Sequence, residues 1–246
     1  MSRDARVSPG ENAPVASADR ILQILGLFTP ARPAWTPQEA AQALKLSRAS
    51  AYRYFAQLEE AGFIEPAPGR RFALGPRIVE LDRQIRLADP LVQASVDEMQ
   101  KLARETGGIA LLCRLHKDRV LCIHQERGVR APRFVSYERG RAMPLHRGAT
   151  SKVILAFLPP KEREHLAARV DAKALENIRH ERMCIAYGEV DPDACGVAVP
   201  LEARSHVVGS LSVVLPASIA KGRLLKSTTK LVRTAGQRIE SELEGS

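Results

Sequence analysis

The segment from residue 36 to 62 carries two helix-start signals and one helix-stop signal close together. Thr36-Pro37-Gln38-Glu39 combines an N-cap threonine, a proline at the first helical position and a glutamate that completes a capping box. Ser47 is a second N-cap, and Gly62 is a typical helix stop. The spacing therefore predicts a short helix through Leu44, a tight turn, and a second helix from Ser47 to about Ala61.

The second of these helices has an apolar face and a basic face. At 100° per residue, one face carries Ala51, Phe55, Leu58 and Ala61, and the other carries Arg48, Ala49, Tyr52, Arg53 and Ala56. A helix-turn-helix inserts such a second helix into the major groove of DNA, where arginines reach guanine edges or phosphates. A solvated helix face would have a similar composition, so this segment alone favours neither interpretation.

The residues that follow favour the DNA-binding interpretation. Residues 63–65 and 72–74 read as two strands that flank a Pro-Ala-Pro-Gly-Arg-Arg tip, which indicates a hairpin. A hairpin directly after a recognition helix makes a winged helix-turn-helix, whose basic tip contacts phosphate or the minor groove. The predicted DNA-binding residues are Arg20, Ser47, Arg48, Ala49, Ser50, Tyr52, Arg53, Arg70 and Arg71.

The rest of the chain divides at a helical linker. Residues 1–17 read as a loose, flexible N-terminal tail, residues 18–76 as the winged helix-turn-helix domain, whose first helix ends at Thr29-Pro30, and residues 77–89 as a rigid linker helix. The next helix starts at Asp89-Pro90 and ends at Gly107-Gly108. Residues 90–246 form the second domain, which we predict to be α+β on an antiparallel sheet. Its expected strands are residues 109–115, 119–125, 133–137, 142–145, 196–201 and 207–215, its expected helices lie within residues 149–158, 158–182 and 218–243, and the chain has no internal repeat.

Charge and composition exclude some classes of protein. The net charge of +9 invites a nucleic-acid interpretation, but residues 1–89 hold 12 basic and 10 acidic side chains against 25 and 18 in the remainder. Net charge therefore does not locate a DNA-binding face. The longest apolar stretch, residues 153–158, is too short for a bilayer of about 30 Å, and no secretory signal is visible, so we expect a cytoplasmic protein without membrane contact.

The four cysteines read as buried thiols, because no Cys-x-x-Cys pair is present. Cys113, His116, Cys122 and His124 have a spacing that resembles a metal site, but a hairpin around Lys117-Asp118 explains it more simply. We predict no metal and no cofactor.

Several of these segments, in this order, resemble the IclR family of bacterial transcriptional regulators over residues 18–244. In the first domain they are Arg20-Ile-Leu-Gln-Ile-Leu, Leu46-Ser-Arg-Ala-Ser-Ala-Tyr-Arg and Gly69-Arg-Arg-Phe-Ala-Leu-Gly. In the second they are Pro144-Leu-His-Arg-Gly-Ala-Thr-Ser-Lys-Val-Ile-Leu-Ala, Gly188-Glu189, Gly196-Val-Ala-Val-Pro and Leu211-Ser-Val. The resemblance implies a GAF-like effector domain, dimers that pair through the DNA-binding domains, and frequent assembly into tetramers.

Three positions depart from the family pattern. Ser151 replaces the usual glycine before lysine, and Arg204-Ser-His replaces a glycine turn in a hairpin one residue shorter than usual. Cys195 falls one position before the place where some members have a pocket cysteine, which is Gly196 here. These departures bear on which ligand binds more than on whether one binds.

The predicted effector site surrounds the start of the helix at Gly148. Backbone N–H groups at a helix N-terminus attract carboxylates and phosphates. Residues 114–147 carry nine basic and three acidic side chains, a surplus that favours an anion or marks a solvated sheet rim. By resemblance the pocket positions are Ala149, Thr150, Gly196 and Ser212, with Met143 and Leu145 as apolar walls, and strand alternation puts Val214 on the face of Ser212. The favoured effector is a small organic or aromatic carboxylic acid, hydrogen-bonded by Ser212.

The sequence thus predicts a ligand-responsive regulator of a catabolic operon that binds double-stranded operator DNA as a homodimer or homotetramer. An enzyme is the alternative: a hydrolase that uses Cys195 or Ser151 with His146. No Gly-x-Ser-x-Gly, Ser-x-x-Lys or His-Glu-x-x-His motif supports it. We therefore expect no catalytic residues.

Overall fold

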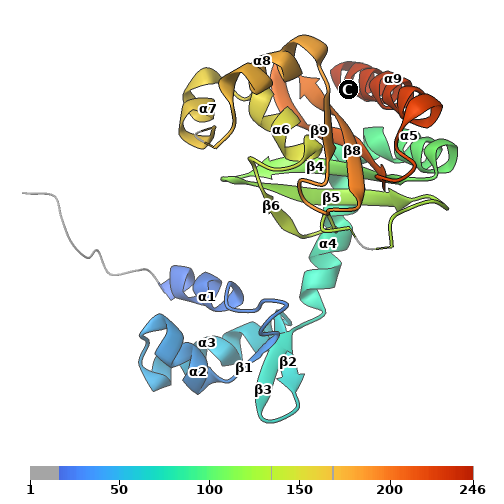
Figure 1. The fold of residues 1–246 in the computed structure, drawn as a ribbon. Coiled ribbons are helices and arrows are strands. Elements are labelled where there is room, and N and C mark those ends of the chain that lie inside the picture. Colours follow the sequence, from blue (N-terminus) through green and yellow to red (C-terminus); the bar gives the residue numbers. More distant parts are fainter. Residues whose placement is uncertain (1–16, 134, 168, 246) are drawn as a thin grey trace, which may run out of the picture. The chain divides into compact units, whose positions relative to one another are not determined.

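The structure is a computed structural model that describes residues 17–133, 135–167 and 169–245 (Figure 1). The chain forms two compact units, which meet between Ile85 and Arg86. We call them the N-terminal and C-terminal units and describe each by itself. The predicted tail lies outside the described residues, apart from Ser17, with which the first helix begins.

The N-terminal unit is helical with a small antiparallel sheet. Its elements are α1 (Ser17–Leu25), β1 (Ala34–Trp35), α2 (Pro37–Leu44), α3 (Arg48–Glu60), β2 (Ile64–Ala67), β3 (Arg71–Leu74) and most of α4 (Arg77–Ala88). The three strands lie in the order β1-β3-β2. This is the predicted winged helix-turn-helix.

The capping signals at both helix starts are confirmed. The Thr36 hydroxyl accepts a hydrogen bond from the Glu39 N–H at 3.1 Å, and the Glu39 carboxylate accepts one from the Thr36 N–H at 2.8 Å. The Ser47 hydroxyl accepts from the Ser50 N–H at 3.1 Å. Lys45 ends α2 in the left-handed region with φ of 53°, which turns the chain into α3 within three residues.

The core of this unit joins all three of its first helices to the sheet. Phe55 and Leu58 are buried as predicted, but Ala61 is exposed because it is the C-cap of α3, and Tyr54 is buried instead. Trp35 donates its indole N–H to the Leu27 carbonyl at 2.9 Å.

Two details of this unit differ from expectation. Helix α1 ends at Leu25 rather than at Thr29, because the chain turns at residues 26–27 and Thr29 pairs with Arg32 in an isolated bridge. Strand β1 was not expected: with two residues it is too short to show a periodicity, and it forms only by pairing with β3.

The C-terminal unit is built on a six-stranded antiparallel sheet. Its helices are α5 (Pro90–Thr106), α6 (Ala149–Phe157), α7 (Pro160–Leu166), α8 (Ala172–Glu181) and α9 (Gly222–Gly245). Its strands are β4 (Ile109–His116), β5 (Arg119–Arg127), β6 (Ala142–Pro144), β7 (Cys184–Tyr187), β8 (Ala194–Ala203) and β9 (His206–Pro216). They lie in the order β6-β5-β4-β9-β8-β7, which confirms the predicted α+β class.

Both faces of this sheet are covered, so the central strands are apolar on both sides. Leu111, Ala198 and Val214 point into the core beneath α6 and α8. Their strand neighbours, such as Leu112 and Val213, belong to a second core with residues of α5 and α9. Figure 1 shows these two helices side by side. The first core leads to the candidate effector site.

Two expectations for this unit are wrong, and one strand was not expected. The described residues of 133–137 form no strand, although Val135 and Tyr137 are both buried, as alternate residues of a strand would be. Hydrogen bonds of side chains, rather than backbone pairing with a neighbouring strand, hold this segment. Strand β7 was not predicted, and it forms by pairing with β8. The last helix begins at Gly222 rather than at Ser218.

The prediction of buried thiols is confirmed. All four cysteines are buried free thiols, and Cys113 lies opposite Cys122 in the β4–β5 hairpin. Within the described ranges, no helix is long and apolar enough to cross a bilayer, and no group of three or more His, Cys, Asp and Glu side chains is arranged to hold a metal ion.

Candidate functional sites

The exposed face of α3 carries the predicted recognition residues. Arg48, Ala49, Tyr52 and Arg53 all lie on the solvent side, and Tyr52 is 58% exposed. Arg53 rests near its neighbour, since its guanidinium lies 5.1 Å from the centroid of the Tyr54 ring. The hydroxyls of Ser47 and Ser50 are bonded to each other at 2.9 Å and remain exposed or partly so.

The wing forms a groove with this helix. The groove has a volume of about 640 Å³, and Tyr52, Arg70 and Arg71 line it together. Arg70 stands at the tip of the hairpin with φ of 57°, next to Gly69 with φ of 79°. Arg71 also faces the Glu39 carboxylate at 3.6 Å. Helix and wing thus present cations and an aromatic ring to one side of the unit.

An aromatic contact fixes the wing against α3. The rings of Phe55 and Phe72 meet edge to face with centroids 5.4 Å apart. Because Phe55 is buried on the inner side of α3, the contact sets the distance between the wing tip and the exposed face.

Arg20 has a different setting from the other predicted DNA-binding residues. Its guanidinium donates to the Leu44 carbonyl at 3.5 Å and to Gln23 at 3.1 Å, which ties α1 to the end of α2. It does not line the groove.

In the C-terminal unit, α6 begins at a position that only glycine suits. Gly148 has φ of 82°, and a Cβ there would lie 2.9 Å from Val190 and 3.0 Å from the Tyr137 hydroxyl oxygen. Its N–H points to the Glu189 carboxylate at 3.0 Å, and Lys152, one turn further, donates to the same carboxylate at 2.5 Å. A carboxylate therefore already sits at this helix N-terminus.

These contacts set the ionisation of Glu189. Partial burial raises its pKa, but the hydrogen bond from Lys152, the Gly148 N–H and the charges of Lys152 and Arg147 outweigh burial, so the pKa lies below its ordinary value. Glu189 is thus charged at neutral pH. Arg147 also donates to the Glu189 carbonyl oxygen.

A small cavity lies beside this carboxylate. Its volume is about 30 Å³, and its walls come from α6, β7, β8, β9 and two loops. Of the predicted positions, Ala149, Thr150, Gly196 and Val214 line it. Gly148, at the centre of the predicted site, lines it too, and the lining residues that sequence reasoning missed are Tyr137, Ala186, Glu189, Val190, Asp191 and Ala194. Gly188-Glu189 had been noted as a family motif, and this was the one signal that pointed to Glu189.

Three predicted positions do not line this cavity. The hydroxyl of Ser212 is fully buried and bonds that of Thr150 at 2.9 Å, so it joins β9 to α6. Met143 and Leu145 are buried in the same core but stand on or beside the edge strand β6.

Two side-chain contacts close the cavity from the segment before β6. The Tyr137 hydroxyl is 2.7 Å from that of Ser151 and donates to the Arg147 carbonyl at 3.1 Å. Ser136 donates to Asp191 from its N–H at 2.8 Å and from its hydroxyl at 2.5 Å. Burial raises the pKa of Tyr137 well above its ordinary value, so the phenol stays neutral.

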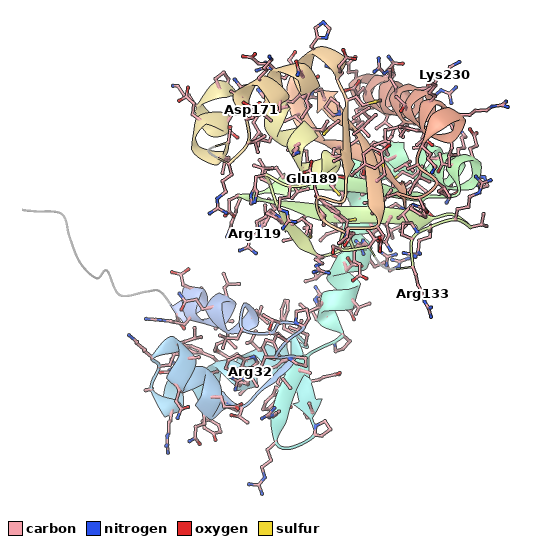
Figure 2. All side chains as sticks on the ribbon, viewed as in Figure 1. Arg32, Arg119, Arg133, Asp171, Glu189 and Lys230 are labelled. Atoms are coloured by element: carbon pink, nitrogen blue, oxygen red, sulfur yellow. The ribbon has the colours of Figure 1, made fainter. Side chains whose placement is uncertain are left out.

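The basic surplus of residues 114–147 does not reach the cavity. None of its nine Lys and Arg side chains lines it. Arg119 and Arg133 are exposed, and Figure 2 shows both pointing away from Glu189. Apart from Arg147, which bonds the Glu189 carbonyl oxygen, no basic residue in the described part of this segment is bonded to Glu189.

The geometry gives no support to a hydrolase. Cys195 is fully buried among the residues that pack on α5 and α9, whereas Ser151 belongs to α6 on the opposite face of the sheet. Burial also raises the pKa of the Cys195 thiol. The Ser151 hydroxyl is bonded to Tyr137 rather than to a base.

Family models match both units. The model of the bacterial transcriptional regulator IclR C-terminal domain matches residues 88–241, and that of the IclR helix-turn-helix domain matches residues 17–68. The first alone covers more than half of the chain.

Similar proteins agree with these matches. "Probable HTH-type transcriptional regulator ArcR" of Halobacterium salinarum is 26% identical over 228 residues, which are 85% of this chain and 87% of that protein. The Escherichia coli regulator XynR is 27% identical over 150 residues, 60% of this chain and 59% of that one.

Solved structures share the fold. An IclR homologue of Microbacterium hydrocarbonoxydans complexed with 4-hydroxybenzoate has a TM-score of 0.80 and 23% identity, and covers 94% of this chain and 100% of its own. An IclR-family regulator of Brucella abortus has a TM-score of 0.77 and 20% identity, and the match covers 97% of this chain and 96% of that one. These relatives are regulators rather than enzymes. The chain is therefore a transcriptional regulator of the IclR family, with a helix-turn-helix DNA-binding domain and an effector-binding C-terminal domain.

Proposed function

We propose that this regulator responds to a small organic or aromatic carboxylic acid that binds at the N-terminus of α6, and that it thereby controls a catabolic operon. One observation carries the proposal: the Gly148 N–H and the Lys152 ammonium together hold a carboxylate, that of Glu189. A helix N-terminus with an adjacent lysine is suited to anions. The 4-hydroxybenzoate complex of the Microbacterium homologue supports the same ligand class.

The mechanism we propose is linkage between the two units. An effector shifts DNA affinity only by its different affinity for two arrangements of the chain. The cavity of about 30 Å³ has room for water but not for an aromatic ring, which needs a pocket of several hundred Å³. The acid-bound state must therefore differ from this one around the cavity.

We further propose that the regulator acts on double-stranded operator DNA as a homodimer or homotetramer. The exposed face of α3 and the wing groove support DNA contact by Arg48, Arg53, Arg70 and Arg71. Exposed apolar side chains on α4, among them Val79 and Leu87 at 67% and 58% exposure, support self-association.

A thermal-shift screen tests the effector class. The purified protein is heated with small carboxylic acids, including 4-hydroxybenzoate, and with the matching amides as neutral controls. A bound acid at 100 times its dissociation constant should stabilise the C-terminal unit by about 2.7 kcal/mol. Any acid that raises the melting temperature is then tested for its effect on DNA affinity. Equal shifts from acids and amides, or shifts without an effect on DNA affinity, would contradict the proposal.

A further inference from the structure

The side chain of Glu189 uses the same groups that an acidic effector would need. Its Oε2 accepts the Gly148 N–H at 3.0 Å and its Oε1 accepts Lys152 Nζ at 2.5 Å. Gly148 is the N-cap of α6 and Lys152 lies on the next turn, so both donors belong to one helix start. The contact spans 41 residues in sequence, from the N-cap of α6 to the loop of residues 188–193 between β7 and β8.

The remaining charges around the cavity disfavour the binding of a second anion. Asp191 lines the cavity as well, and its carboxylate accepts from Ser136. An added carboxylate beside Glu189 would share one ammonium and one N–H with it, and like charges within a few ångströms of each other are strongly disfavoured. The cavity of about 30 Å³ is also too small for both groups.

We infer that Glu189 is an internal competitor of the effector: an acid binds by exchanging its own carboxylate for that of Glu189 at the Gly148 N–H and Lys152. The inference rests on the proposed function. Exchange moves the Glu189 side chain out of the site, and this enlarges the cavity on the side where the acid enters. It also breaks a tie between α6 and the loop of residues 188–193, so ligand binding and loop release become one event.

Chemical rescue tests this without a known effector. Glu189→Ala removes a carboxymethyl group, and propionate supplies the missing carboxylate with one carbon more than the variant lost. Propionate should therefore raise the melting temperature of Glu189→Ala, while propionamide should not. Propionate should raise the melting temperature of the wild type much less at the same concentration, because there it must first displace Glu189. Asp191→Asn is the matched control, since that carboxylate belongs to the same loop but contacts Ser136, and propionate should stabilise it no more than the wild type.

A second variant keeps the test valid if Glu189→Ala does not fold. Glu189→Gln retains the size of the side chain and an acceptor for the Gly148 N–H but loses the charge that pairs with Lys152. A nearby charge typically shifts an ionic equilibrium by about ten-fold or more. Calorimetry should therefore show 4-hydroxybenzoate binding at least about ten-fold more tightly to Glu189→Gln than to the wild type, with the affinity for 4-hydroxybenzamide unchanged.

The outcomes separate this inference from the proposed function. If acids alter DNA binding by the wild type but propionate fails to rescue Glu189→Ala and Glu189→Gln binds acids no more tightly, the exchange is wrong and the effector class stands. If rescue and tighter binding occur but no acid alters DNA affinity in any variant, the site binds carboxylates and the proposed function is wrong.

Discussion

Ser151 departs from the family's usual glycine, and the structure supplies a physical reason for a hydroxyl there. Its partner is the Tyr137 hydroxyl at 2.7 Å, in a buried contact that spans 14 residues. Tyr137 reaches the site from an irregular segment, and the alternation that predicted a strand over residues 133–137 did not indicate its partner Ser151. Asp191 likewise has a distant partner, Ser136, which is 55 residues away. Contacts of this kind depend on the complete fold.

A double-mutant cycle measures the Tyr137–Ser151 contact. Ser151→Ala removes one hydrogen bond and should cost about 0.5–1.5 kcal/mol of unfolding free energy in the C-terminal unit. Tyr137→Phe also leaves the Arg147 carbonyl without this donor and should cost about 1–3 kcal/mol. The double variant should cost less than the sum, as measured by calorimetry. Tyr187→Phe, which removes a half-exposed hydroxyl bonded to the Ala220 carbonyl, is the control. Additive costs would show that the two hydroxyls do not interact.

Arg53 gives the prediction for DNA recognition at the same scale. Arg53→Ala should weaken binding to a duplex selected by the wild-type protein by about 1–3 kcal/mol if the side chain reads a base. Fluorescence anisotropy at fixed salt measures the affinity. Gln57→Ala, exposed on the same helix, is the control and should bind as the wild type does. Unchanged affinity in a folded Arg53→Ala protein would remove Arg53 from the interface.

At the scale of elements, the predictable features were those with a local signal. The start of α2 follows from Thr36 and Glu39, which are three residues apart, and that of α5 from Asp89, whose carboxylate accepts the Leu91 N–H at 3.0 Å. The N-terminal half of α6 was equally predictable, and with it Ala149 and Thr150 in the cavity wall. Strand β1 was missed because two residues contain too little pattern. Strand β7 was missed because its four residues, unlike those of β2 and β3, are not joined to a partner by a short hairpin, and pairing with β8 decides it.

The wing is the element whose predicted role is purely electrostatic. Replacing Arg70 and Arg71 with alanine should lower the affinity for selected and for random duplexes to a similar degree. The salt dependence of binding should become less steep, by about two counterions. Because Arg71 also faces Glu39 at 3.6 Å, Arg70→Ala should account for the larger share. Titrations from low to high salt measure the slope, with Arg204→Ala on the C-terminal unit as the control. Loss confined to the selected duplex would mean that the wing reads sequence.

At the scale of the whole molecule, the fold class and the order of the two units followed from the sequence, but the state of the effector site did not. Helix-turn-helix signals and strand patterns are local, and they indicated the architecture. Whether the start of α6 is open or filled depends on Glu189, which the fold brings across the sheet to Gly148. The surplus of basic residues favoured an anion site in the C-terminal unit. The anion at the start of α6 is the carboxylate of Glu189, which belongs to the chain itself.

The single tryptophan makes the two units separately visible in solution. Trp35 is buried in the N-terminal unit, and the Arg32 guanidinium lies 3.4 Å from its ring centroid. Its emission therefore reports on the DNA-binding unit, while far-ultraviolet circular dichroism reports on both. An acid that binds the C-terminal unit should raise the temperature of the dichroism transition that belongs to that unit. The temperature of the emission transition should stay the same. If both transitions move together, the two units unfold as one cooperative body. Binding of an acid at α6 then stabilises the DNA-binding unit, with its helix α3, as much as the C-terminal unit.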